Sequence, residues 1–244
     1  MNEFKRVGIF GGTFNPVHLA HLRMAEEAAE ALRLDKVIFV PAGKPPFKCK
    51  RGKAYMAGTD ERAAMVRLAI RGNPLFELSG IECRNEGISY TVDTLEAFSN
   101  RGGRLFLIMG MDAFLEFHLW RSPKRILELA QLAVVSRPAK FDCGQGGGWL
   151  AAEKSPFVPR GSIKKALEAA GGKKRPVSIR LSPFGMLSLI NATAMDISAT
   201  GIRARIRTGK SVRYLLPQSV ESFIMTRNLY GKREGLGQRK EKSS

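Results

Sequence analysis

Gly11-Gly12-Thr13-Phe14-Asn15-Pro16-Val17-His18-Leu19-Ala20-His21 is the stretch of sequence from which the fold can be read. It follows a short apolar run, residues 7–10, which has the length and composition of a buried strand. It leads into residues 22–34, where apolar side chains recur at helical spacing. The stretch therefore marks a strand-to-helix junction, and the glycines there allow the backbone to approach a ligand closely.

Two histidines and the start of a helix determine which kind of ligand this junction favours. Unpaired N–H groups and the positive end of the helix dipole favour an anion at such a position. His18 and His21 are three residues apart, so they lie on one face of the helix start. Two imidazoles beside an anion site indicate charge stabilisation of a phosphoryl centre. The alternative is a plain Gly-Gly turn before a surface helix, and the stretch is neither a dinucleotide-binding Gly-x-Gly-x-x-Gly nor a P-loop.

Apolar strands and helical segments alternate along the following residues. The expected helices between the strands cover residues 59–72, capped by Thr59 or Asp60, then residues 92–98 and 123–129. The expected strands cover residues 36–40, 76–79, 105–109 and 132–135. This alternation predicts an α/β fold, a Rossmann-like doubly wound parallel sheet with helices on both faces.

Polar segments follow four of the predicted strands. In a doubly wound sheet the ligand crevice lies beyond the carboxyl ends of the strands. The segments are residues 11–21, 44–48 and 110–112, and Arg137. All four are therefore expected at the same edge of the sheet, which is the main argument for an active site from the residues alone.

The pattern weakens after Arg137 and then becomes regular again. A helix is predicted over residues 162–170, strands over 177–181 and 186–190, and a short helix capped by Ser198 or Thr200. A last helix is predicted to begin at Pro217. We expect one domain over residues 1–230, with residues 196–230 as a small helical C-terminal segment, and a disordered basic tail over residues 231–244.

Composition limits the function classes. The 244 residues carry a formal net charge of +18, from 40 basic and 22 acidic side chains, which favours anionic partners such as nucleotides or nucleic acid. The three cysteines, Cys49, Cys83 and Cys143, are widely spaced, which argues against a disulfide framework and favours a reducing cytoplasm. No apolar run reaches the roughly 18 residues of a membrane helix, and no signal-type segment follows the N-terminus.

An ordered set of motifs runs from about Val7 to Tyr230, with a weak patch between residues 141 and 195. Its segments are residues 11–18, 18–21 with two histidines, the basic Pro-Pro loop at 44–48, 89–95, 110–112 with Trp120, 197–203 and 211–217. This set resembles the bacterial nicotinate-nucleotide adenylyltransferases of the nucleotidyltransferase superfamily. Ala20 stands where the two-histidine motif of that family usually has glycine, and Phe47 where its basic loop usually has histidine.

The resemblance implies an activity. The adenylyl group of ATP would pass to the phosphate of nicotinate mononucleotide, giving nicotinate adenine dinucleotide and pyrophosphate in NAD biosynthesis. Mg²⁺ would be bound through the ATP phosphates rather than by a cluster of protein ligands. ATP and nicotinate mononucleotide are the implied partners, with no membrane and no specific nucleic acid, and the oligomeric state is left open.

The resemblance also implies roles for individual residues. His18, His21 and Arg203 would be catalytic. ATP would be bound by Gly11, Gly12, Thr13, Phe14, Lys48, Ser198 and Thr200. Nicotinate mononucleotide would be bound by Lys44, Tyr90, Thr91, Asp112, Trp120 and Arg137. The competing interpretations are helix capping for Ser198, Thr200 and Asp112, a core position for Trp120, and surface positions for the lysines and Arg137.

Two other functions fit the same motifs less completely. A sibling enzyme using nicotinamide mononucleotide or phosphopantetheine would share the superfamily motifs, so only the region of Tyr90, Thr91 and Trp120 favours nicotinate. An RNA-binding protein built on this fold is suggested by the charge of +18 and by the basic run at residues 173–175. The intact set of histidines, Ser198, Thr200 and Arg203 favours the enzyme.

Overall fold

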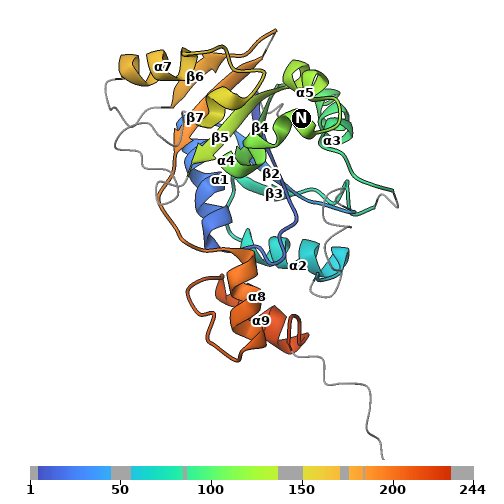
Figure 1. Cartoon of the computed structure of the whole chain (residues 1–244). Helices are drawn as coiled ribbons and strands as arrows, with labels where there is room; N and C mark the ends of the chain where they lie inside the picture. The colour runs from blue at the N-terminus through green and yellow to red at the C-terminus, as the bar shows by residue number, and fades with distance from the viewer. Residues whose placement is uncertain are drawn as a thin grey trace, which may run out of the picture.

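The computed structural model describes residues 5–44, 56–84, 87–136, 151–170, 176–183 and 185–231. These residues build one seven-stranded sheet with the strand order β3-β2-β1-β4-β5-β7-β6 (Figure 1). The strands are β1 (Arg6–Gly12), β2 (Lys36–Pro41), β3 (Phe76–Leu78), β4 (Arg104–Gly110), β5 (Ala130–Ser136), β6 (Val177–Arg180) and β7 (Met186–Asn191).

The doubly wound fold is confirmed, with one correction at the edge of the sheet. The pairs joining β3, β2, β1, β4, β5 and β7 are all parallel, as predicted. β6 instead runs antiparallel to β7. The reason is the short connection between them, in which the Leu181 N–H donates to the Gly185 carbonyl (3.0 Å) and Gly185 has φ +100°. A tight turn of this kind can join only antiparallel neighbours.

The helices follow the predicted pattern, with shifted ends. α1 begins at Leu19 rather than at residue 22, with His18 as its N-cap. The N-cap of α2 is Gly58, so the expectation of a Thr59 or Asp60 cap was wrong, and the Glu61 carboxylate accepts from the Gly58 N–H (2.7 Å). The helices are α1 (Leu19–Leu32), α2 (Thr59–Ala69), α3 (Thr91–Ser99), α4 (Met111–Leu115), α5 (Pro123–Leu129), α7 (Ser162–Ala170), α8 (Ala199–Arg207) and α9 (Gln218–Thr226), with 3₁₀ turns η2 (Phe117–Leu119) and η4 (Ala151–Lys154).

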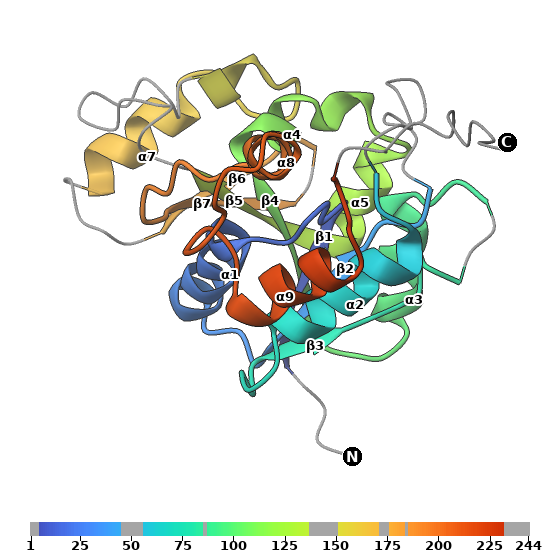
Figure 2. The same ribbon diagram turned by 90° about the horizontal axis from the view of Figure 1, so that it is seen from below.

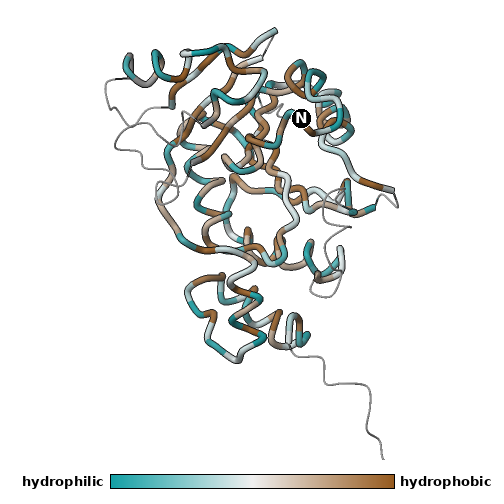
Figure 3. Tube along the Cα trace, viewed as in Figure 1, coloured by the Kyte–Doolittle hydropathy of each residue, from teal (hydrophilic) through white to brown (hydrophobic). Residues whose placement is uncertain are grey.

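Alternate residues of each strand enter different hydrophobic layers. Phe10, Phe39 and Phe106 pack on the side of α1, α2, α8 and α9, whereas Ile9 and Leu107 pack on the side of α3, α4, α5 and α7. This alternation is what a sheet covered on both faces requires. Figure 3 shows the resulting run of hydrophobic residues through the central strands. Within the described residues, no helix is both long and apolar enough to cross a membrane.

The C-terminal helices pack against the N-terminal half of the fold. Figure 2 shows α9 lying beside α2, with α1 on its other side. The Leu19 N–H, at the start of α1, donates to the Leu215 carbonyl (3.1 Å). The Thr193 N–H donates to the Glu27 carboxylate on the same helix (2.7 Å). The segment of residues 193–217 is therefore fastened along α1, and it brings α8 to the edge of the sheet where β1 ends.

The chain after β2 passes very close to the turn at residues 81–84. A Cβ at Gly43 would lie 2.2 Å from the Glu82 carbonyl oxygen and 2.8 Å from Ser89 Oγ. The Ser89 N–H donates to the Lys44 carbonyl in the same place (3.3 Å). Only glycine fits this position, and the approach places Lys44 next to the segment that begins α3.

Replacing Gly43 with alanine is expected to destabilise the protein, because the methyl group overlaps backbone atoms that cannot move independently. The cost should lie near the upper end of the roughly 1–3 kcal/mol typical of overpacking. Urea unfolding gives the free energy of unfolding. Gly80→Ala is the matched control, since a Cβ at Gly80 meets nothing within 4 Å. Equal unfolding midpoints for the two variants would contradict the prediction.

Candidate active site

A cavity of about 630 Å³ opens at the carboxyl ends of β1 and β4. The strand order reverses between these two strands, and ligands of doubly wound folds bind at such a reversal. The volume is in the range of pockets that hold small molecules. The residues that line it are Phe10, Gly11, Gly12, Thr13, Phe14, His21, Met24, Ala42, Glu82, Ser89, Tyr90, Thr91, Leu107, Ile108, Met109, Gly110, Ala113, Glu116, Leu119, Trp120 and Arg121.

The two histidines stack on each other at the start of α1. Their ring centroids are 3.7 Å apart, with an angle of 23° between the rings. His18 is buried, with 2% of its surface exposed, and His21 is partly exposed in the cavity wall. The His18 backbone N–H donates to Nδ1 of His21 (3.2 Å). The pair is therefore built into the helix cap, which holds the His21 ring in a fixed orientation.

The cap also selects the tautomer of His21. A ring nitrogen that accepts a hydrogen bond carries no proton, so the neutral imidazole has its proton on Nε2. The ring of Phe14 packs edge-on against His21, with centroids 5.2 Å apart and 79° between the rings. Phe14 is buried and has φ +47°, a left-handed conformation that turns the chain sharply here. Packing and capping together make Nε2–H of His21 an oriented donor.

Aromatic side chains form another part of the cavity wall. Tyr90 is the N-cap of α3, and Thr91 is the first residue of that helix. The Arg121 guanidinium lies over the Tyr90 ring, 4.5 Å from its centroid. Trp120 is partly exposed, as predicted, and packs edge-on against Phe117 (5.6 Å between centroids). The start of α3 thus presents its first N–H groups beside two aromatic rings.

Glu82 is a carboxyl group in the cavity wall that the sequence analysis did not identify. Its Oε1 accepts from the Thr94 hydroxyl (2.7 Å), and the Gly43 N–H also donates to its carboxyl group. Burial raises the pKa of Glu82 above its ordinary value, against the opposing effect of these hydrogen bonds and of Arg62. Glu82 is partly buried, and it contributes a carboxyl group to the cavity wall.

The start of α8 is joined to the loop after β1 through Asn15. Ser198 is the N-cap of α8, as one of the two alternatives predicted, and its Oγ accepts from the Gly201 N–H (3.1 Å). Arg203 donates from Nη1 to the Asn15 carbonyl (2.6 Å) and from Nη2 to the Thr200 hydroxyl (3.2 Å). Burial lowers the pKa of Arg203. The segment of residues 197–203 therefore contacts the segment of residues 11–18 directly.

The side chain of Asn15 connects two further segments. Its Oδ1 accepts from the Ala57 N–H (3.0 Å) and from the Tyr230 hydroxyl (2.7 Å). Asn15 is 8% exposed and Tyr230 is 9% exposed. Burial raises the pKa of the Tyr230 phenol well above its usual range, so this hydroxyl remains a donor. The chain near residue 230 is thereby fixed to the loop after β1.

The structure describes fourteen of the residues predicted for a site and brings eight of them together in the cavity wall. Gly11, Gly12, Thr13, Phe14, His21, Tyr90, Thr91 and Trp120 line the cavity. His18, Lys44, Asp112, Ser198, Thr200 and Arg203 do not line it. The N-cap of α4 is Gly110, so the capping interpretation of Asp112 was wrong, and Asp112 lies in the first turn. Lys48 and Arg137 lie outside the described residues, as do Phe47 and residues 171–175 and 232–244.

Sequence reasoning missed several residues of the site region. Glu82 and Arg121 stand in polar stretches that carry no periodic signal. Ala20, which stands in place of the usual glycine, packs into the hydrophobic core and does not line the cavity. A signal was available for Arg62, because it shares the apolar face of α2 with Met65 and Val66 and is buried there.

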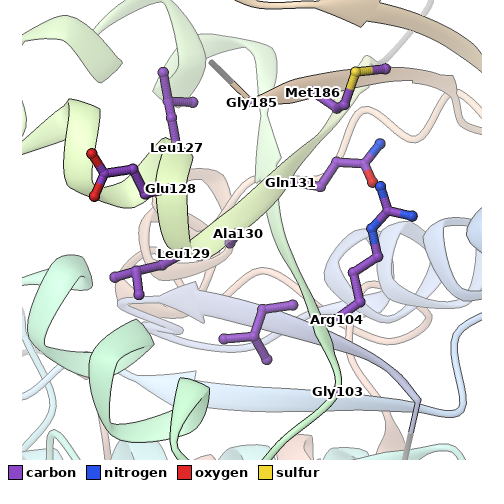
Figure 4. A pocket seen from close by; sticks show the side chains of 10 residues that line it. Gly103, Arg104, Leu127, Glu128, Leu129, Ala130, Gln131, Gly185 and Met186 are labelled. Carbon is purple, nitrogen blue, oxygen red and sulfur yellow. The ribbon is translucent and has the colours of Figure 1, made fainter. Parts of the chain in front are cut away.

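A second hollow, of about 460 Å³, lies at the opposite edge of the sheet. Its lining includes Arg104, Ala130 and Met186, the first residues of β4, β5 and β7. Figure 4 shows the side chains of Arg104 and Gln131 extending toward each other across it. Because it lies at the amino ends of the strands, it is not where ligands of this fold bind.

Comparison with known proteins identifies the family. Residues 9–205 match the family model described as cytidylyltransferase-like. The chain is 40% identical over 227 residues to the probable nicotinate-nucleotide adenylyltransferase of Trichlorobacter lovleyi, covering 92% of this chain and 99% of the relative. The relative of the same name from Desulfatibacillum aliphaticivorans is 39% identical with the same coverage. This chain belongs to the nicotinate-nucleotide adenylyltransferase family. The predicted resemblance and enzyme class are thus confirmed.

Solved structures of more distant enzymes share the fold of this adenylyltransferase. The nicotinic acid mononucleotide adenylyltransferase of Plasmodium falciparum complexed with NaAD matches with a TM-score of 0.64 at 15% identity. The same protein complexed with APC matches with a TM-score of 0.63 at 16% identity. Each match covers 93% of this chain and 97% of that chain. At these identities the likeness concerns the fold.

Replacing Tyr230 with phenylalanine is expected to lower the free energy of unfolding by about 0.5–1.5 kcal/mol, since Asn15 loses one of the two donors to its amide oxygen. Denaturant unfolding measures the change. Tyr214→Phe is the matched control, because Tyr214 is 87% exposed and its loss of a hydroxyl should change stability very little. A Tyr230→Phe variant as stable as the control would contradict the role given to this hydrogen bond.

Proposed function

We propose that this chain transfers the adenylyl group of ATP to the phosphate of nicotinate mononucleotide, releasing pyrophosphate. The observation that carries the proposal is the oriented ring of His21, stacked on the buried His18, in the wall of a cavity that is also lined by Tyr90 and Trp120. The family relationship supports the same reaction, because the curated relatives are named for it. The two parts of the cavity correspond to the two substrates.

The ATP phosphates are proposed to lie against the loop after β1 and the start of α1. Backbone N–H groups of Gly11 to Phe14 and Nε2–H of His21 would donate to phosphate oxygens. Ser198, Thr200 and the start of α8 would hold the outer phosphates, and Arg203 would add positive charge while remaining bonded to Asn15. Lys48 is proposed to contact the same phosphates.

The reaction needs alignment and charge stabilisation rather than a protein base. An oxygen of the nicotinate mononucleotide phosphate forms a bond to the α-phosphorus of ATP, and the bond from that phosphorus to the oxygen bridging to the β-phosphate breaks. The electron pair leaves with pyrophosphate, so no proton has to be removed from the nucleophile. His21 donates a hydrogen bond where negative charge develops, and the fixed ring makes that donation effective.

Magnesium is proposed to enter with ATP. Within the described residues, no group of three or more His, Cys, Asp or Glu side chains is placed to hold a metal ion. The residues around the proposed phosphate position are N–H donors and cations, so the metal would be held by phosphate oxygens and water. When bound, Mg²⁺ would neutralise part of the polyphosphate charge.

Nicotinate mononucleotide is proposed to lie against the start of α3 and Trp120. The first N–H groups of α3, at Tyr90 and Thr91, would donate to the nicotinate carboxylate, and Trp120 would stack on the pyridine ring. Lys44, Asp112 and Arg137 are proposed to contact the mononucleotide's phosphate and ribose. The Lys44 carbonyl accepts from the Ser89 N–H, which places the backbone of Lys44 beside the segment that starts α3.

Other parts of the proposal concern partners and location. Nucleic-acid binding, suggested by the charge of +18, is proposed to be non-specific only. Use of nicotinamide mononucleotide as the main substrate is disfavoured by the N–H groups at the start of α3, which suit a carboxylate better than an amide. The cytoplasmic location predicted from the scattered cysteines stays a prediction.

Replacing His21 with alanine is expected to lower turnover about 100- to 1000-fold, the usual effect of losing one preorganised donor to developing charge. Pyrophosphate release with ATP, Mg²⁺ and nicotinate mononucleotide measures it. His118→Ala is the control, because His118 is exposed in the η2 turn and should keep full activity. Near-normal turnover of the His21→Ala variant would overturn the assignment.

The specificity constant is expected to favour nicotinate over nicotinamide mononucleotide by roughly ten- to a hundredfold. A carboxylate accepts from two N–H donors, whereas an amide turns its own NH₂ toward one of them, and each unpaired donor costs about 1–3 kcal/mol. Trp120→Ala should weaken the binding of both mononucleotides by a similar factor, since stacking on the pyridine ring does not distinguish a carboxylate from an amide. Equal constants, or a preference for nicotinamide, would contradict the proposed pocket.

A further inference from the structure

Arg62 is a buried cation beneath the loop after β1. It is the fourth residue of α2, is 1% exposed, and does not line the cavity. Its guanidinium donates to the carbonyls of Ala57 (3.2 Å), Thr13 (2.9 Å) and Gly43 (3.1 Å), and to the Thr59 hydroxyl (3.2 Å). All four acceptors are neutral oxygens, and three of them are main-chain carbonyls.

This arrangement is a costly way to stabilise a fold. Burial lowers the pKa of Arg62, and the nearby Glu82, Cys83 and Tyr230 only partly oppose the effect. Apolar side chains often replace buried charges with no loss of stability, so the cation is weak evidence for a stabilising role. The planar guanidinium instead fixes the relative positions of the groups that accept from it, because its N–H donors point in fixed directions.

The three carbonyl groups belong to segments that lie against different parts of the proposed site. Thr13 is in the loop proposed to hold the ATP phosphates, whereas Gly43 precedes Lys44 and contacts the segment that starts α3. Ala57 precedes α2, and its N–H donates to Asn15 (3.0 Å), which gives a second link to the loop after β1. One guanidinium thus joins the ATP side of the cavity to the mononucleotide side.

We propose that Arg62 is a positioning residue that sets the spacing between these two loops, so that the mononucleotide phosphate is aligned with the α-phosphorus of ATP. This inference rests on the proposed function. Misplacement of a reacting group by about 1 Å can cost about a hundredfold in rate. Loss of the guanidinium should therefore lower kcat, with little change in the KM of either substrate, because each loop keeps its own contacts.

The test compares Arg62→Lys and Arg62→Gln with the wild-type protein. Lysine keeps the charge but cannot reach three carbonyls with fixed geometry, so both variants should lose about a hundredfold in kcat, with KM values changed only a few-fold. Arg67→Lys and Arg67→Gln are the matched controls, since Arg67 is exposed on the same helix. Wild-type-like kcat in Arg62→Lys, or losses that appear mainly in KM, would overturn the proposal.

Amide hydrogen exchange tests the same proposal without using activity. In both Arg62 variants, exchange at residues 11–15 and 42–44 should rise, while the central strands stay protected. Wild-type activity with nicotinate mononucleotide tests the proposed function separately, so the two failures are distinguishable. Unchanged exchange in both segments would overturn the role of Arg62.

A milder variant covers the case in which the Arg62 variants do not fold. Thr59→Val removes one of the four acceptors at nearly constant volume and should retain the fold. It is expected to raise exchange at residues 42–44, because the Thr59 hydroxyl and the Gly43 carbonyl share Nη2 of Arg62. It should also lower kcat about two- to fivefold, which is less than the roughly hundredfold loss expected when a reacting group is misplaced. If Thr59→Val matches the wild type in both measurements, the proposal is wrong.

Discussion

The hydrogen bonds accepted by Asn15 hold the active-site region together. Its amide oxygen receives the Ala57 N–H and the Tyr230 hydroxyl, and its carbonyl oxygen receives Arg203. Three segments far apart in the sequence thus meet at one residue of the loop after β1. Because such a buried amide oxygen is costly to leave without donors, the loop conformation and the docking of the C-terminal helices depend on each other. The C-terminal helices are in this sense part of the site.

The cavity combines rigid walls with strongly shielded polar groups. His21 is fixed by the helix cap and by Phe14, and Glu82 is held between Thr94 and Gly43. Arg62 lies behind the wall and bonds only to neutral oxygens. Interactions between charges are stronger in such surroundings than in water. A site that works by alignment and by stabilising charge requires this combination.

Local sequence patterns predicted the strands of the parallel sheet and the helices that cover it, because buried parallel strands are continuous apolar runs and α1 has a clear apolar face. They also placed the candidate site at the edge where the parallel strands end, and the cavity lies at that edge, beside β1 and β4. The antiparallel β6 was missed because the direction of a strand depends on the turn before its partner and not on its own residues. The contacts of Tyr230 with Asn15 and of Arg62 with Thr13 could not be predicted, because these partners are brought near only by the tertiary fold. The Gly58 cap was missed because no side chain signals it.

The contact between Tyr230 and Asn15 has a consequence for the order in which the site is assembled during synthesis. The two residues are separated by 215 positions, so the loop after β1 leaves the ribosome long before its last donor exists. Strands β1 to β5 can pair as they emerge, since each finds a neighbour already made. The loop after β1, in contrast, acquires its full set of hydrogen bonds only once residue 230 has been released. A chain that is still being synthesised can therefore have strands β1 to β5 paired while the loop after β1 lacks one of its donors. The sheet thus folds before the protein becomes catalytically competent.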